Sequence, residues 1–185
     1  MSSCRKIFID LGANKGSSIE WCEKYYGLEY EIYAFEPMPR LFHDLRRKYA
    51  DRVVLYRQAA WITDGLKYFN IADNDLSSSF YEHLRSCDVR GSITVEVFDF
   101  SKWLEANFSD DYVVVKMNIE GAEFPVLSKM IKDGNIGIVN ELYYQFHPNI
   151  EPKPEPKVVA DILMALNSSG VRFQPWINST TTRRM

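Results

Sequence analysis

Residues 6–16 read KIFIDLGANKG, and this stretch decides the fold. Its first part, residues 6–11, is an apolar run typical of a β-strand, and a glycine ends it. The following residues, 17–26, carry helix signals, with Ser17 and Glu20 in the spacing of a capping box. A strand that leads through a glycine turn into a helix is the repeating unit of parallel α/β sheets. This stretch therefore favours an α/β fold.

Strands and helices alternate along most of the chain. Strands are expected where short apolar runs end in turn residues, and helices where apolar residues recur with a period near 3.6. This alternation favours a doubly wound, mostly parallel α/β sheet with right-handed crossovers. The expected strands are 6–11, 30–35, 52–56 with an extension toward 60 left open, 112–117, 136–144 and 171–177. The expected helices are 17–26, 40–50, 101–108, 123–132 and one that follows a Pro-rich connection over 148–156.

One segment, residues 63–100, interrupts this alternation. It contains two turn signals with glycine and two segments of alternating polarity, 67–71 and 92–98. Such a pattern is typical of short antiparallel strands. We therefore expect one domain over residues 1–177, with a small antiparallel insertion, and a frayed tail over residues 178–185.

Composition excludes several classes of protein. The 185 residues include 22 Lys and Arg against 25 Asp and Glu, a net charge of −3, which argues against non-specific nucleic-acid binding. No apolar run approaches the ~20 residues that a membrane helix needs, and no signal-peptide pattern is present. Three cysteines, Cys4, Cys22 and Cys87, have no metal-ligand spacing and form no closed disulfide set. We expect a soluble cytoplasmic protein with no nucleic-acid or membrane partner.

The ligand site is expected beyond the carboxyl ends of the strands, where the strand order reverses. Glycines in the first loop allow a tight turn and close approach of a ligand to backbone N–H groups. Glu36, at the next strand end, is placed to accept hydrogen bonds from two ribose hydroxyls. Together they predict a nucleoside-containing ligand, against the alternative of a structural turn and an exposed carboxylate. The candidate residues are Asp10, Gly12, Ala13, Asn14, Gly16, Ser17, Glu36, Pro37, Ala60, Trp61 and Asn118.

Charge near the loop indicates which nucleoside is bound. A dinucleotide site normally has the pattern G-x-G-x-x-G and offers a helix N-terminus to pyrophosphate. Here the third glycine is absent, and Asp10 would repel phosphate. S-adenosyl-L-methionine has no phosphate, and it carries an ammonium group that Asp10 can help to bind, directly or through water. We therefore expect this cofactor and keep an NAD-dependent oxidoreductase as an alternative.

Three blocks of sequence resemble the signatures of one family. Residues 10–17 read DLGANKGS, residues 33–37 read YAFEP, and residues 115–123 read VKMNIEGAE. These blocks resemble those of the FkbM family of methyltransferases, and the similarity runs in order from about residue 7 to residue 147. The resemblance implies a Rossmann-like sheet of the class I methyltransferase type, with S-adenosyl-L-methionine as methyl donor. It also implies O-methylation of a hydroxyl on a sugar, a glycan or a small polyketide-type metabolite.

Asn118 departs from the family pattern, which usually has aspartate in K-x-D-x-E-G-x-E. Asparagine keeps the hydrogen-bonding capacity and loses the charge and the basicity. It can therefore replace an aspartate that holds the cofactor, but not one that acts as a base or a metal ligand. The terminal hairpin of the fold is also expected to be shortened or missing. Both features leave open an alternative function, that of a binding module that retains the cofactor pocket and has lost catalysis.

A general base would accelerate methyl transfer to a hydroxyl. Glu120, after the fourth strand of the main alternation, is the first candidate, and His147 titrates in the right range. Glu141 lies in an apolar strand, where a carboxylate needs a partner or a function. Together with Glu123, these three candidate bases could surround a divalent cation. Their spacing is not diagnostic of a metal site, so we assign no metal ligand. The acceptor, a small molecule or a carbohydrate, is expected to bind near the 63–100 insertion, and its candidate residues are Ser79, Glu123 and Tyr144. The alternative role of Glu123 is to cap the helix that follows it.

Overall fold

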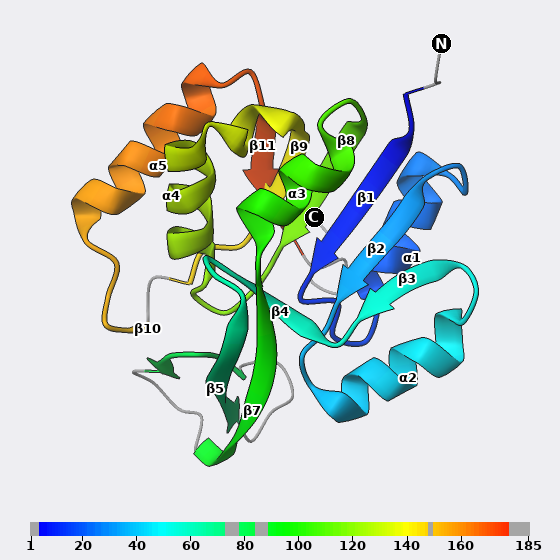
Figure 1. Ribbon diagram of the computed structural model, residues 1–185, viewed down its shortest axis with the longest axis vertical. Coiled ribbons are helices and arrows are strands. Elements are labelled where there is room, and N and C mark those ends of the chain that lie inside the picture. Colours follow the sequence, from blue (N-terminus) through cyan, green and yellow to red (C-terminus); the bar gives the residue numbers. More distant parts are fainter. Residues whose placement is uncertain (1–3, 73–77, 84–88, 148–149, 178–185) are drawn as a thin grey trace, which may run out of the picture.

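The centre of the fold is a six-stranded sheet in which every neighbouring pair is parallel (Figure 1). The computed structural model describes residues 4–72, 78–83, 89–147 and 150–177. The sheet order is β11-β9-β8-β1-β2-β3, so the order reverses between β1 and β8. This confirms the predicted doubly wound α/β fold. The strands are β1 (Lys6–Leu11), β2 (Glu31–Phe35), β3 (Val53–Tyr56), β8 (Tyr112–Met117), β9 (Val139–Tyr144) and β11 (Arg172–Pro175).

Helices cover both faces of this sheet (Figure 1). One face packs against α1 (Ser17–Tyr26) and α2 (Pro39–Tyr49), and the other against α3 (Phe100–Phe108), α4 (Glu123–Asp133) and α5 (Pro156–Ser168). Because both faces are covered, successive residues of the central strands are buried, and these strands read as continuous apolar runs. No helix among the described residues combines the length and the hydropathy that a membrane crossing requires.

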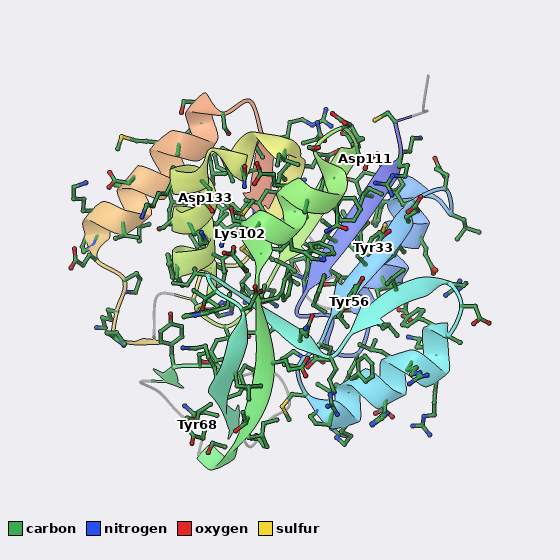
Figure 2. All side chains as sticks on the ribbon, in the orientation of Figure 1. Tyr33, Tyr56, Tyr68, Lys102, Asp111 and Asp133 are labelled. Atoms are coloured by element: carbon green, nitrogen blue, oxygen red, sulfur yellow. The ribbon has the colours of Figure 1, made fainter. Side chains whose placement is uncertain are left out.

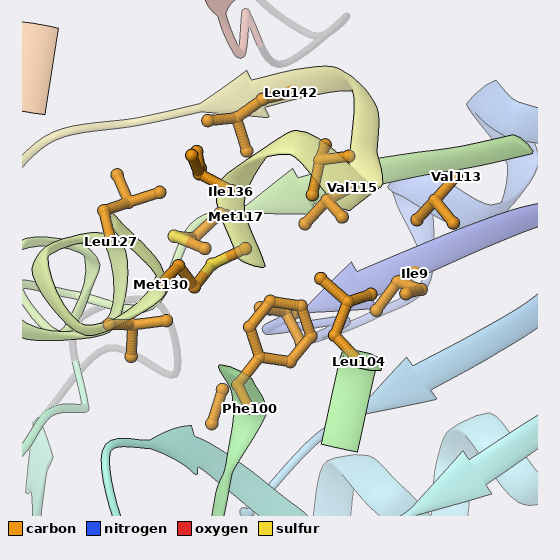
Figure 3. Packing of buried hydrophobic residues seen from close by; sticks show 14 of the residues in the cluster. Ile9, Phe100, Leu104, Val113, Val115, Met117, Leu127, Met130, Ile136 and Leu142 are labelled. Atoms are coloured by element: carbon orange, nitrogen blue, oxygen red, sulfur yellow. The ribbon is translucent and has the colours of Figure 1, made fainter. Parts of the chain in front are cut away.

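The larger hydrophobic cluster lies between the sheet and α3, α4 and α5 (Figure 3). Phe100 and Leu104 of α3 pack with Ile9 of β1 and with Val115 and Met117 of β8, and all five side chains have 0% exposure. Burial of each such side chain contributes roughly 1.5–3 kcal/mol. This layer therefore holds the ends of β1 and β8 side by side.

A second, smaller sheet lies between β3 and α3 in the chain. Its order is β4-β7-β5, from β4 (Gln58–Trp61), β7 (Val89–Asp99) and β5 (Gly65–Ala72). The pair of β5 and β7 is antiparallel, as expected, whereas β4 pairs in parallel with β7. This hairpin extends away from the main sheet (Figure 1), and Tyr68 on its surface is 78% exposed (Figure 2).

A two-stranded ribbon joins the insertion to the segment that follows β9. Its strands, β6 (Glu82–His83) and β10 (Ile150–Glu151), are antiparallel. Two segments far apart in the sequence therefore meet in this ribbon. Of the polar loop expected over residues 73–79, residues 73–77 lie outside the described residues, as does the tail over 178–185.

Two expected strands differ from those in the structure. The strand expected between residues 52 and 60 is divided into β3 and β4, which belong to different sheets. The strand expected over residues 136–144 begins as a 3-10 helix, Asn135–Ile138, and continues as β9. The amide of Asn135 donates to the carbonyl oxygen of Ser101 at 3.2 Å, which holds this segment against α3 before the strand begins.

Candidate active site

The glycine loop after β1 is packed against the end of β8. The N–H groups of Gly12 and Ala13 both donate to the carbonyl oxygen of Phe35, at 3.1 and 3.0 Å. Gly12 has φ 84°, and a Cβ atom there would lie 2.2 Å from the carbonyl oxygen of Asn118. Only glycine fits this position, because the backbone is left-handed and a neighbouring backbone oxygen occupies the side-chain space.

The same loop leads into the N-terminus of α1 through Gly16. Gly16 has φ 85°, and the ring of Tyr49 lies 2.6 Å from the position of an added Cβ. The Tyr49 hydroxyl donates to the Gly16 carbonyl oxygen at 3.0 Å. Gly16 is the N-cap, and no side chain caps this helix end, so the expected capping box of Ser17 and Glu20 is wrong. The first turn of α1 thus presents N–H groups that no capping side chain covers.

A buried ion pair between Lys116 and Asp10 contacts this loop. The ammonium of Lys116 lies 3.0 Å from Oδ1 of Asp10 and donates to the carbonyl oxygen of Gly12 at 2.7 Å. The Ser18 hydroxyl donates to Oδ2 of Asp10. Asp10 has 0% and Lys116 3% side-chain exposure. The carboxylate is therefore neutralised inside the protein, and the expectation that Asp10 binds the cofactor ammonium or repels phosphate is not supported by its position.

Glu36 lies at the carboxyl end of β2 and faces the glycine loop. One carboxylate oxygen accepts from the N–H of Asn14 at 2.8 Å, and the other accepts from the N–H of Met38 at 2.9 Å. The residue is 4% exposed, so the alternative of an exposed carboxylate is wrong. Burial raises the pKa of Glu36 to about 7, although the two backbone N–H groups act in the opposite direction. Each oxygen keeps a lone pair for a ligand hydroxyl.

Asn118 follows β8 and lies opposite the glycine loop. Its N–H donates to the carbonyl oxygen of Leu11 at 3.2 Å. Its side-chain Oδ1 is buried and has no hydrogen-bond partner within the described part of the chain. A buried acceptor without a donor costs about 1–3 kcal/mol. This orphaned oxygen fits a site that is completed by a donor group of a ligand.

The other cofactor candidates lie around this loop in less specific environments. Ala60 is 2% exposed and belongs to the apolar cluster under α3 and α4. Trp61 is half-buried, and its ring centroid lies 5.0 Å from that of Phe80. Ser17 is exposed on α1, and Pro37 is half-buried after Glu36.

Three titratable side chains meet beyond the ends of β8 and β9. Glu123, the first residue of α4, is fully buried, and its oxygens accept from the N–H groups of Ile119 at 2.7 Å and Gly121 at 2.8 Å. Nδ1 of His147 lies 3.0 Å from Oε1 of Glu123. Nε2 of the same ring lies 3.4 Å from Oε1 of Glu120. The structure therefore brings together Glu120, Glu123 and His147 as a carboxylate–imidazole–carboxylate cluster.

Burial and mutual charge shift the protonation of this cluster. Burial raises the pKa of Glu120 to about 7, partly offset by the opposite charges of His147 and Lys116. Burial lowers the pKa of His147, but the hydrogen bond and charge of Glu123, with the charge of Glu120, outweigh it and raise the pKa above its ordinary value. The two nitrogens face two different carboxylates. Among the described residues no group of three His, Cys, Asp or Glu is arranged to hold a metal ion.

Glu141 does not belong to this cluster. Its carboxylate accepts from the hydroxyls of Tyr26 at 2.8 Å and Tyr112 at 2.6 Å, and the Arg172 guanidinium lies 2.8 Å away. Burial raises the pKa of Glu141, but these partners outweigh it and hold the pKa below its usual value. Tyr112 begins β8 and Arg172 begins β11, so this network lies toward the opposite ends of the strands from the glycine loop. The structure therefore removes Glu141 from the candidate bases.

The predicted acceptor residues Ser79 and Tyr144 make internal contacts. The buried Ser79 hydroxyl accepts from the N–H of Tyr81 at 2.8 Å and donates to its carbonyl oxygen at 3.1 Å. The ring of Tyr144 packs on Phe146, with centroids 4.3 Å apart. Neither contact places these side chains against the Glu120 cluster, and their roles toward an acceptor stay predictions.

Two residues of this region were not singled out from the sequence. Lys116 is the lone charge in an otherwise apolar strand, and that contrast was a visible signal of a buried partner. Tyr81 lies within the insertion and carried no signal. Burial raises the pKa of Tyr81, and the charge of Glu123 adds to the shift, which places this phenol near the cluster.

The strand order, the glycine loop and the acidic residue after β2 define a Rossmann-like α/β protein. The chain belongs to the FkbM methyltransferase family, because residues 10–173 match the family model of the methyltransferase FkbM domain. The crystal structure of methyltransferase FkbM from Methylobacillus flagellatus KT is similar, with a TM-score of 0.44 and 18% identity over 72% of this chain. The match spans 30% of that protein. A comparison with curated proteins finds no match.

Proposed function

We propose that this protein is an S-adenosyl-L-methionine-dependent O-methyltransferase that acts on a hydroxyl of a sugar, a glycan or a small metabolite. The observation that carries the proposal is the pair of buried acceptors around the glycine loop. Glu36 offers two carboxylate oxygens and Asn118 an unpartnered amide oxygen, on opposite sides of Gly12. A nucleoside has hydroxyl and amino donors that can satisfy both.

The residues of the loop fit the cofactor as follows. Glu36 accepts hydrogen bonds from the ribose hydroxyls, and Asn118 Oδ1 accepts from an amino or hydroxyl donor of the cofactor. The uncapped first turn of α1 attracts the carboxylate of the methionine part. Trp61, whose ring contacts Phe80 and the Lys67 ammonium, offers an aromatic face to the base of the cofactor. When bound, the cofactor supplies a methyl group on a positively charged sulfur.

The Glu120 and His147 side chains serve as proton acceptors for the hydroxyl of the acceptor. Glu120 follows β8 and His147 follows β9, and both keep partial access to solvent, with side-chain exposures of 18% and 15%. A general base of this kind contributes roughly 10²–10⁴-fold to rate. The base is supplied by these residues and not by Asn118, so the family's aspartate need not be present for proton removal.

Calorimetry with S-adenosylhomocysteine tests the proposal and separates the two roles. Glu36→Gln is expected to weaken binding about tenfold or more, because a charge-assisted acceptor is replaced by an amide. Glu120→Gln is expected to leave binding nearly unchanged. The exposed Glu31→Gln on β2 is the matched control. Saturation by NADH with no response to S-adenosylhomocysteine would favour the oxidoreductase alternative, and equal losses in both variants would contradict this division of roles.

Cofactor binding is expected to release protons near neutral pH. In the free protein burial raises the pKa of Glu36 to about 7, and ribose donors bind its ionised form. Affinity for S-adenosylhomocysteine should therefore fall about tenfold when the pH is lowered from about 8 to about 6. Calorimetry in two buffers of different ionisation enthalpy measures the release. Glu36→Gln should lose this proton release, and an unchanged release in that variant would assign it to another group.

A further inference from the structure

We propose that Glu123, His147 and Glu120 act as one proton relay, in which Glu123 holds His147 with its proton on Nδ1 and directs Nε2 and Glu120 toward the acceptor hydroxyl. Glu123 is thereby a positioning residue, and not only the acceptor for the N–H groups of the turn before α4. The inference rests on the proposed methyl transfer to a hydroxyl, and it assigns the base of that reaction to a pair of groups instead of one side chain.

Glu123 is the fixed end of the relay. Its carboxylate has 0% side-chain exposure, and each oxygen accepts one backbone N–H, from Ile119 and from Gly121. A carboxylate held by two backbone donors cannot rotate to follow a moving imidazole. Its Oε1 is 3.0 Å from Nδ1 of His147, so the stable arrangement has an N–H on Nδ1 that donates to this oxygen.

A second contact supports the same tautomer. The side-chain Nε2 of Gln145 lies 3.3 Å from Nε2 of His147. An amide nitrogen only donates, so this contact requires a lone pair on Nε2 of the imidazole. These two neighbours favour a neutral ring with its proton on Nδ1 and its lone pair on Nε2, and ionised Glu120, 3.4 Å from Nε2, favours the proton that Nε2 then accepts.

Glu120 is the open end of the relay. Its Oε1 lies 3.4 Å from Nε2 of His147, and its side chain is 18% exposed, against 0% for Glu123. Glu120 has φ 52°, a conformation that costs a non-glycine residue about 1–2 kcal/mol. The next residue, Gly121, has φ 101° and completes the turn. This turn aims Glu120 back toward the imidazole, as the relay requires.

The charges around Glu120 and His147 determine the pH range in which this pair accepts a proton. Glu120 and His147 face each other, Glu123 faces both, and Lys116 and Tyr81 lie within electrostatic range. The pair is ready when Glu120 is ionised, which occurs above its pKa of about 7, and His147 is neutral, which occurs above its own raised pKa. The O–H bond of the acceptor would then break, and the proton would bind to Nε2 or to Glu120. The electron pair left on oxygen would form the bond to the methyl carbon as the methyl–sulfur bond breaks, with that bond's electron pair going to the neutral thioether sulfur.

Two-bond proton–nitrogen NMR spectra of the full chain, with and without S-adenosylhomocysteine, test the relay without any acceptor. The chain has three histidines, His43, His83 and His147, and His147→Asn identifies the signal. We expect neutral His147 to carry its proton on Nδ1, which is the minor form of a free histidine side chain. We expect its pKa to lie above the ordinary value of about 6.5.

Variants separate the relay from a purely structural role of Glu123 in the turn before α4. Glu123→Gln is expected to lower the pKa of His147 by about one unit or more and to mix the tautomers. Glu120→Gln is expected to lower the pKa and keep the tautomer. Glu155→Gln is the matched control, because Glu155 is the exposed N-cap residue of α5 and makes no side-chain cap hydrogen bond. It should leave the His147 spectrum unchanged.

Several outcomes would overturn the relay. If the neutral His147 of the wild type carries its proton on Nε2, the relay is contradicted whatever the variants show. This test remains available if the Glu123→Gln protein does not fold. A folded Glu123→Gln protein with unchanged His147 tautomer and pKa would leave Glu123 with only its structural role in the turn before α4. Binding of S-adenosylhomocysteine by the wild type is measured separately, so its absence would contradict the proposed function while the spectrum still reports on the relay.

Discussion

Replacing Gly12 with alanine is expected to lower the free energy of unfolding by about 3 kcal/mol or more and to abolish binding of S-adenosylhomocysteine. The left-handed backbone at φ 84° disfavours any side chain, and the added Cβ would lie 2.2 Å from the carbonyl oxygen of Asn118. That oxygen belongs to the backbone at the end of β8, so it cannot move aside cheaply. The loop would have to separate from β8, and the acceptors on its two sides would lose their spacing.

Gly134→Ala is the matched control for this substitution. Gly134 ends α4 with φ 79°, nearly the same backbone conformation, but no atom lies within 4 Å of an added Cβ. Its replacement should cost only the conformational term, about 1–2 kcal/mol, and should leave cofactor binding intact. Urea unfolding and calorimetry measure both quantities. Equal destabilisation by the two variants would show that the close approach of Gly12 to Asn118 does not contribute to the loss of stability.

Replacing Lys116 with methionine is expected to cost about 3–5 kcal/mol of stability, because it leaves the Asp10 carboxylate buried without its cation. Lys116 is 3% exposed and Asp10 0%, and the lysine ammonium also binds the Gly12 carbonyl oxygen. The variant therefore loses both the charge balance and a support of the loop. Binding of S-adenosylhomocysteine should fall together with the melting temperature.

Two further variants make this prediction specific. Lys102→Met removes a lysine that is 75% exposed and lies 3.6 Å from Asp99, and it should cost at most about 1 kcal/mol. Combining Asp10→Leu with Lys116→Met should recover part of the loss, since no unpaired charge then remains in the core. A double variant less stable than Lys116→Met would show that packing, not the buried charge, causes the effect.

Much of the cofactor region was predictable because it depends on local chemistry. A glycine loop after an apolar strand, and an acidic residue after the next strand, are neighbours in any parallel sheet whose order reverses there. The structure places Gly12 and Glu36 together as expected. Glu36 is nevertheless buried and hydrogen-bonded to the loop, a state that depends on Asn14 and Met38 and could not be deduced from the position of one carboxylate.

The assignment of catalytic side chains was less predictable. Glu120, Glu123 and Glu141 are all acidic residues near strand ends in the sequence. Burial, strand register and the direction of each side chain separate them: Glu141 binds Tyr112 and Arg172, whereas the other two meet His147. One residue of register reverses the face on which a strand side chain lies, so spacing alone cannot assign these partners.

The sequence by itself determined the order of the elements, the α/β class and the glycine turn, because periodicity and backbone freedom are properties of neighbouring residues. Only the tertiary structure decided which charges meet: Asp10 with Lys116, and His147 between Glu120 and Glu123. The physical reason is that an ion pair or a relay requires atoms a few ångströms apart. That proximity comes from the packing of strands and helices from distant parts of the chain.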